Sequence, residues 1–229
     1  MTTIRKARSL RVGLTLLAAA FAALVALAFA GGHDAAAHGK ADSEARRPIS
    51  RAELDFRNDM RRLWEDHVTW TRLAIISLTT DSPDTGATVG RLLENQVDIG
   101  NAIKPFYGED AGQELTRLLR DHILIAADLI AAARAGDGPA VAEAQARWEA
   151  NADELAALLS SANPRHWKLA DVRAMLGAHL ALTTDEVLAR LGGDWEADVA
   201  AYDQIHLQAL EMADTLAVGI VKQFPRRFR

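Results

Sequence analysis

The sequence predicts an all-α protein, an up-and-down helical bundle of six helices arranged as three repeated αα-hairpins. Alanine and leucine dominate the composition, whereas runs of β-branched residues are short. Glycine and proline gather between long segments whose apolar residues recur at helical spacing. Of the 229 residues, 49% are hydrophobic and 25% are charged, which is enough apolar material for one sizeable core.

Residues 1–30 are expected to be a signal peptide or an N-terminal membrane anchor. Four basic residues precede an uncharged apolar stretch over 12–30, and Ala28-Phe29-Ala30 is a pattern at which a signal peptidase cuts. The 19 residues of this stretch also approach the length that spans a bilayer. In both cases we expect the rest of the chain to be exported, periplasmic or extracellular, and to meet a membrane only through this segment.

The body of the chain is acidic and has no cysteine. Removing residues 1–30 changes the formal net charge from −5 to −9, because that segment holds four basic and no acidic residues. An acidic body argues against nucleic acid as a partner. The lack of cysteine excludes disulfides, thiolate zinc sites, iron–sulfur clusters and a cysteine nucleophile. The sequence also lacks a glycine-rich phosphate loop, a G-x-S-x-G motif and an H-E-x-x-H motif.

The helical bundle domain is expected over 50–225, after a small, polar tether over 31–49 and before a basic, frayed tail over 226–229. Ser50 followed by Glu53 is a capping-box pattern that starts the first helix. The first three expected helices cover about 51–80, 87–104 and 110–134. Three further helices follow, separated by breaks at 135–139, 160–168 and 192–194, and the last ends near Phe224.

An internal repeat places a histidine at matching positions of three helices. The segment HILIAADLIAAARAGD begins at His122, and HLALTTDEVLARLGGD begins at His179, and both reach a Gly-Asp pair at the same distance. A weaker third copy surrounds His67, where LWEDHV matches LLRDHI around His122. We therefore expect the three histidines to occupy equivalent places in the fold.

The second helix of each predicted hairpin carries an amide and, three residues later, a carboxylate. The pairs are Asn95 with Asp98, Asn151 with Glu154 and Gln208 with Glu211, and each amide follows its histidine by 28 or 29 residues. The midpoint then falls in a predicted turn, so histidine and amide lie at one height, roughly 20 Å from the turn at about 1.5 Å per residue. The expected buried layer holds His67, His122, His179, Asp98, Glu154 and Glu211, flanked by Asn95, Asn151 and Gln208 as groups that orient them.

Two interpretations of this layer stay open. Neutral imidazoles with carboxylates suit a transition metal (Zn, Fe, Mn or Cu) or another small ligand, bound by a carrier, sensor or store. Alternatively, each histidine only hydrogen-bonds its own hairpin, and the layer fixes the packing of an envelope scaffold or of a module that binds an envelope protein. A metal-dependent oxidase or hydrolase is a further alternative, although no catalytic residue is assigned.

A second, weaker metal site is expected at the N-terminus. If cleavage follows Ala30, the new terminus is Gly31-Gly32-His33. Its amino group, two amides and the His33 imidazole form a square-planar nitrogen set that suits Cu(II) or Ni(II).

Five segments also resemble a known family: LWEDHVTWTRLAIIS, NQVDIGNAIKPFYG, LLRDHILIA, NADELAALLSSANP and MADTL. They are similar to an uncharacterised bacterial family of exported or cell-associated all-helical proteins. The resemblance covers roughly residues 55–225 and includes the histidines and the amide–acid pairs. Because no activity is established for that family, the resemblance implies a fold and leaves the function open.

Overall fold

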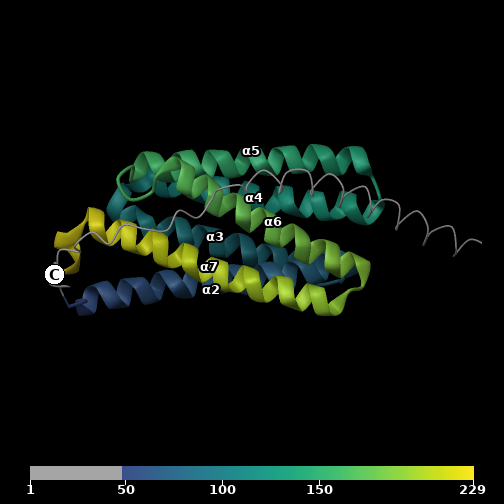
Figure 1. Cartoon of the computed structure of the whole chain (residues 1–229), viewed down its shortest axis with the longest axis horizontal. Coiled ribbons are helices and arrows are strands. Elements are labelled where there is room, and N and C mark those ends of the chain that lie inside the picture. The colour runs from purple at the N-terminus through teal and green to yellow at the C-terminus, as the bar shows by residue number, and fades with distance from the viewer. Residues whose placement is uncertain (1–47) are drawn as a thin grey trace, which may run out of the picture.

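A computed structural model describes residues 48–229, which form six α-helices and a short 3-10 helix (Figure 1). The elements are α2 (Arg51–Thr80), α3 (Thr85–Tyr107), α4 (Glu109–Ala135), α5 (Gly138–Ala162), α6 (Leu169–Gly192), α7 (Trp195–Gln223) and η1 (Pro225–Phe228). The predicted all-α class and six-helix bundle are confirmed, whereas the division into three repeated hairpins stays a prediction. The predicted leader, most of the tether and His33 lie outside the described residues.

The helices form a closed ring in which each packs on the next. Helix α7 returns to pack on α2, and α2 also contacts α4 and α6 across the interior. The α4–α5 and α6–α7 turns lie at one end of the bundle, opposite the C-terminus (Figure 1). Because α2, α4 and α6 are alternate helices of an up-and-down bundle, they run in the same direction. None of the described helices is both long and apolar enough to cross a membrane.

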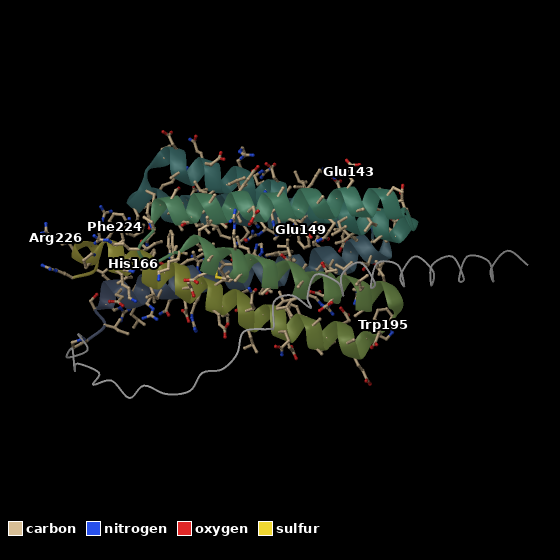
Figure 2. All side chains as sticks on the ribbon, turned by 45° about the horizontal axis from the view of Figure 1, so that its top comes forward. Glu143, Glu149, His166, Trp195, Phe224 and Arg226 are labelled. Carbon is tan, nitrogen blue, oxygen red and sulfur yellow. The ribbon has the colours of Figure 1, made fainter. Side chains whose placement is uncertain are left out.

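The outer faces of the helices are polar and the inner faces build the core. Glu143 and Glu149 of α5 are exposed and project outward (Figure 2). On the same helix Val141, Ala144 and Trp148 are buried. This division at helical spacing is the amphipathic pattern that makes a surface helix pack on one side.

Two Gly-Asp pairs form the turns at one end of the bundle. Gly136 and Gly193 end α4 and α6 in the left-handed conformation, with φ of 70° and 74°. The carboxylates of Asp137 and Asp194 then accept hydrogen bonds from backbone N–H groups three residues later, both at 3.1 Å. Glycine therefore ends one helix and aspartate caps the next, as these residues do in other proteins.

The expectation of a frayed basic tail is wrong. Phe228 of η1 is buried, and its ring lies 5.1 Å from that of Phe56 and 5.6 Å from that of Phe106. The Ser50 hydroxyl donates to the Phe228 carbonyl at 2.6 Å, while its oxygen caps α2 by accepting from the backbone N–H of Glu53. An apolar side chain within a basic segment holds the C-terminus against the start of the domain.

Candidate functional site

Three histidines meet inside the bundle at the height that their spacing predicts. His67 lies on α2, His122 on α4 and His179 on α6. The ring centroids of His67 and His179 are 6.1 Å apart, and those of His122 and His179 are 6.2 Å apart. The three residues are only 3–5% exposed. Three imidazoles from alternate helices are therefore buried in one layer.

Side-chain amides hold two of these rings through the Nδ1 atom. Asn151 Oδ1 lies 2.8 Å from His122 Nδ1, and Gln208 Oε1 lies 3.1 Å from His179 Nδ1. Since an amide oxygen only accepts, Nδ1–H of each ring donates. The Nε2 atom of each neutral ring is then left as an acceptor.

The same amides also tie their helix to the histidine helix. Each –NH₂ group donates to the carbonyl four residues before the histidine: Asn95 to Leu63 at 3.0 Å, Asn151 to Leu118 at 3.0 Å and Gln208 to Met175 at 2.9 Å. Asn151 and Gln208 thus each bond both a ring nitrogen and a backbone carbonyl. In each of these helix pairs the histidine and the amide therefore lie at the same height along the bundle, as their spacing predicts.

In the α2–α3 pair two neighbouring amides contact the histidine. Gln96 Nε2 lies 3.2 Å from His67 Nδ1, and Asn95 forms a further hydrogen bond with the His67 side chain. Gln96 was not among the residues predicted for the layer. The signal was present in the sequence, because Gln96 follows its histidine by 29 residues, as Asn151 and Gln208 follow theirs.

The carboxylates expected in the layer lie elsewhere. Asp98, Glu154 and Glu211 are all exposed, so the prediction that they are buried with the histidines is wrong. Three residues past the amide correspond to an offset of about 60° around the helix. In these three helices that offset is enough to carry the carboxylate from the buried face to the exposed one. Within residues 48–229, no group of three or more His, Cys, Asp or Glu residues is placed to hold a metal ion.

Burial keeps the three imidazoles neutral. Desolvation, with a smaller contribution from the neighbouring imidazoles, lowers the pKa of His67 and of His122 to about 3. Desolvation also lowers the pKa of His179, although the hydrogen bond that the ring donates to Gln208 acts in the opposite direction. For His122 and His179 the amide contact at Nδ1 is the one side-chain hydrogen bond of the ring among the described residues, so Nε2 of these two rings has no partner there.

A cavity of about 570 Å³ extends from the histidines toward the α4–α5 turn. Along α4 its lining runs from His122 to Gly136, 14 residues apart, which corresponds to roughly 21 Å. The lining at the turn end includes Gly136, Pro139 and Ala142, which are exposed, whereas the histidines are buried. The cavity is therefore closed at the polar layer and opens toward the end of the bundle.

Two further polar atoms at this cavity have no partner in the described chain. They are the Trp148 indole N–H and the Thr71 hydroxyl. Trp148 is 2% exposed, and its ring lies 5.2 Å from that of His122. The closed end therefore combines unused acceptors with an unused donor, an arrangement suited to a ligand with a polar head.

No protein family, curated protein or solved structure matches this chain. The resemblance to a bacterial family of helical proteins stays a prediction. The function is therefore argued from the geometry of the layer and the cavity.

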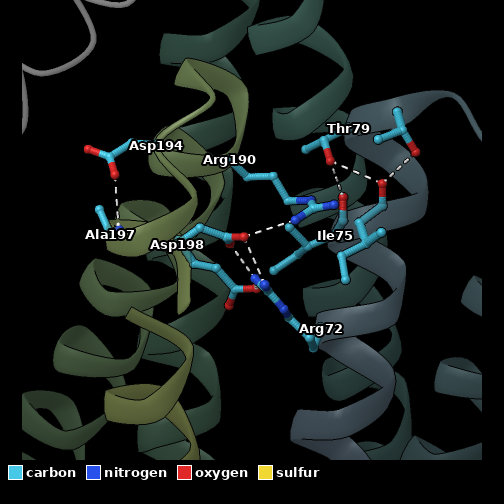
Figure 3. A network of polar contacts seen from close by, with 10 residues as sticks. Arg72, Ile75, Thr79, Arg190, Asp194, Ala197 and Asp198 are labelled. Atoms are coloured by element: carbon cyan, nitrogen blue, oxygen red, sulfur yellow. Dashed lines mark hydrogen bonds and ion pairs between the residues drawn. The ribbon is translucent and has the colours of Figure 1, made fainter. Parts of the chain in front are cut away.

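A buried ion-pair cluster joins α2, α6 and α7 (Figure 3). Arg72 donates to Glu186 at 2.7 Å and to Asp198 at 2.8 Å, and Arg190 donates to Asp198 at 2.9 Å. Burial raises the pKa of Glu186, whereas the hydrogen bonds from Arg72 and Arg190 outweigh burial and lower the pKa of Asp198.

One signal for this cluster was present in the sequence: Arg72 stands within the apolar run TRLAIISL. A charged residue in an apolar helical run indicates a buried polar contact, as His122 does in its own run. Glu186 directly precedes Val187, which lines the cavity. The cluster therefore lies next to one wall of the cavity.

Proposed function

We propose that this protein is an exported carrier, sensor or store that binds a small, largely apolar molecule in its bundle. The observation that supports the proposal is an apolar cavity that ends on three neutral histidines and on two buried polar groups without a partner in the described chain, the Trp148 indole N–H and the Thr71 hydroxyl. Buried polar atoms in proteins are nearly always paired, so unpaired ones at a cavity point to a missing partner. The amides hold the rings in place, which makes the site preformed.

A purely structural role for the layer does not account for the cavity. Hydrogen bonds between histidine and amide satisfy Nδ1 and fix the packing in both interpretations. An empty apolar cavity, however, costs stability in proportion to its volume. A scaffold would gain by filling this space with larger side chains than Ala126 and Ala133, whereas a binding protein needs the space.

The test is binding of a neutral apolar fluorophore, N-phenyl-1-naphthylamine, to the delipidated full-length chain. Ala126 of α4 lines the cavity, whereas Ala131 of the same helix is exposed and lies outside it. We expect the wild type and Ala131→Phe to bind the fluorophore equally. Ala126→Phe should bind at least tenfold more weakly with unchanged helix content by circular dichroism. Equal binding by all three proteins, or no binding by the wild type, would contradict the proposal.

The transition-metal alternative is tested on the same proteins. Neutral imidazoles are in the protonation state that metal binding requires. Metal content is measured by plasma mass spectrometry on untagged protein and on His122→Ala. About one equivalent of Zn, Fe, Mn or Cu that disappears in the variant would replace the apolar ligand with a metal. Fluorophore binding without stoichiometric metal supports the apolar ligand.

A further inference from the structure

We infer that the ligand is a single-chain amphiphile: a linear hydrocarbon chain with a hydroxyl-bearing head, either an alcohol or a protonated carboxylic acid. The head reaches the histidine layer and the chain lies along α4 toward the α4–α5 turn. This inference rests on the proposed function and specifies its ligand.

The elongated cavity favours a chain over a compact molecule. Its lining on α4 runs through Ile123, Ala126, Ile130 and Ala133 between the histidine and the turn. That path corresponds to roughly 20 Å at about 1.5 Å per residue. One end is polar and closed and the other is exposed, so a linear molecule fits with its head inside.

Apart from Thr71, the polar side chains along the cavity wall beyond the closed end already form hydrogen bonds. The hydroxyl of Thr183 donates to the His179 carbonyl at 2.8 Å, and that of Thr184 donates to the Leu180 carbonyl at 2.9 Å. Gln145 donates to Glu149 at 2.7 Å. Between the head and the opening, the wall therefore offers a ligand few unpaired donors and matches a hydrocarbon chain.

The closed end requires a head that donates and accepts. Nε2 of His122 and of His179 are acceptors, because Nδ1 of each ring donates to an amide oxygen. The Trp148 indole N–H is a donor without a partner in the described chain. A hydroxyl group donates to an imidazole and accepts from the indole, whereas an ester or an ether only accepts.

The charge of the lining excludes a bare anion as the head. His67, His122 and His179 are the titratable residues among those that line the cavity, and no lysine or arginine of the described chain lines it. A carboxylate buried there would lack a counter-ion, so a fatty acid must enter with its proton or give that proton to an imidazole. An alcohol carries no such requirement.

The opening lies where two helices separate. Helix α6 diverges from α5 toward the end that carries the α4–α5 and α6–α7 turns (Figure 1). Ala142 of α5 and Leu188 of α6 both line the cavity, together with Gly138 and Pro139 at the start of α5. The small residues on α5 leave room for a chain to emerge between the two helices.

The test compares four ligands that displace the fluorophore from the full-length chain. They are 1-hexadecanol, hexadecanoic acid, methyl hexadecanoate and cholesterol. We expect the alcohol or the acid to bind at least tenfold more tightly than the methyl ester, which cannot donate, and than the rigid sterol. Equal affinities for the ester, or tighter binding of the sterol, would overturn the inference. Fluorophore binding without these preferences would leave the proposed function standing.

A conservative variant tests where the head group of the ligand lies, and the pH dependence of binding distinguishes an alcohol from a carboxylic acid. Trp148→Phe removes the indole N–H and keeps an aromatic ring, so it should reduce the preference for the hydroxyl ligand over the ester severalfold. An unchanged preference, with helix content kept, contradicts this placement of the head. Binding of the acid should weaken as pH rises above the pKa of the free acid, whereas binding of the alcohol should not change.

Discussion

The choice of amides over carboxylates beside the histidines decides the charge of the layer. A carboxylate near His122 would favour imidazolium and raise its pKa, whereas the neutral Asn151 leaves desolvation dominant. The ring therefore stays neutral, and its Nε2 atom is available as an acceptor. Asn151 also donates to the Leu118 carbonyl, so one side chain both positions the ring and links two helices.

Replacing Asn151 with alanine should destabilise the fold by about 2 kcal/mol, because it leaves the buried His122 Nδ1–H without an acceptor. It also removes the hydrogen bond from Asn151 to the Leu118 carbonyl, which keeps its helical partner. Urea denaturation monitored by circular dichroism measures the change. Glu154→Ala on the same helix is the control and should change stability by less than about 0.5 kcal/mol, because that carboxylate is exposed. Equal losses in both variants would contradict the assignment.

Stability should fall as the solution is acidified below about pH 6.5, the ordinary histidine pKa. The pKa of His67 and of His122 is about 3 in the folded state, so the unfolded chain binds more protons between pH 3 and 6.5. The stabilisation is complete above pH 6.5 and is lost toward pH 3, by up to about 1.4 kcal/mol per pH unit for each histidine. Urea denaturation at pH 7 and pH 5 measures the slope. His122→Gln should reduce that slope by about one proton, and an unchanged slope would contradict the burial of a neutral ring.

The helices were predicted well where local signals decide, and less well where distant contacts do. Ser50 and the Gly-Asp pairs gave boundaries that the structure reproduces. Helix α3 instead continues through Pro105 to Tyr107, past the expected break at 104. Proline lacks the N–H that a helix interior requires, which is why a break was expected there. The ring of Phe106 packs on that of Phe56 with centroids 5.1 Å apart, and this contact stabilises the additional helical residues.

The contact between α3 and α4 should depend on two facing glycines. A Cβ atom added at Gly100 would lie 2.6 Å from the Gly112 carbonyl, a backbone atom that cannot move aside cheaply. We expect Gly100→Ala to destabilise the protein although alanine favours helix. Gly90 of the same helix has nothing within 4 Å of such a Cβ atom, so Gly90→Ala should stabilise by up to about 1 kcal/mol. Thermal unfolding of both variants gives the signs, and stabilisation by Gly100→Ala would contradict the close approach.

At the scale of the molecule, the repeat located the histidines but not the whole site. Spacing from a turn gives the height of a residue, so His67, His122 and His179 were placed in one layer correctly. Spacing does not give the direction of a side chain accurately enough, so the carboxylates were misplaced. The cavity and the cluster around Arg72 depend on which helices become neighbours, and the sequence alone does not specify this.

Breaking the ion-pair cluster should affect the whole bundle, because the cluster ties α2 to both α6 and α7. Arg72→Leu should cost about 3 kcal/mol or more, because it leaves the Glu186 carboxylate, 1% exposed, without its hydrogen-bonded partner. Adding Glu186→Leu should recover much of that loss, since the unpaired buried charge is then gone. A double-mutant cycle by urea denaturation, with Arg51→Leu as the exposed control, measures the coupling. Additive losses in the double variant would show that the two side chains stabilise the bundle independently.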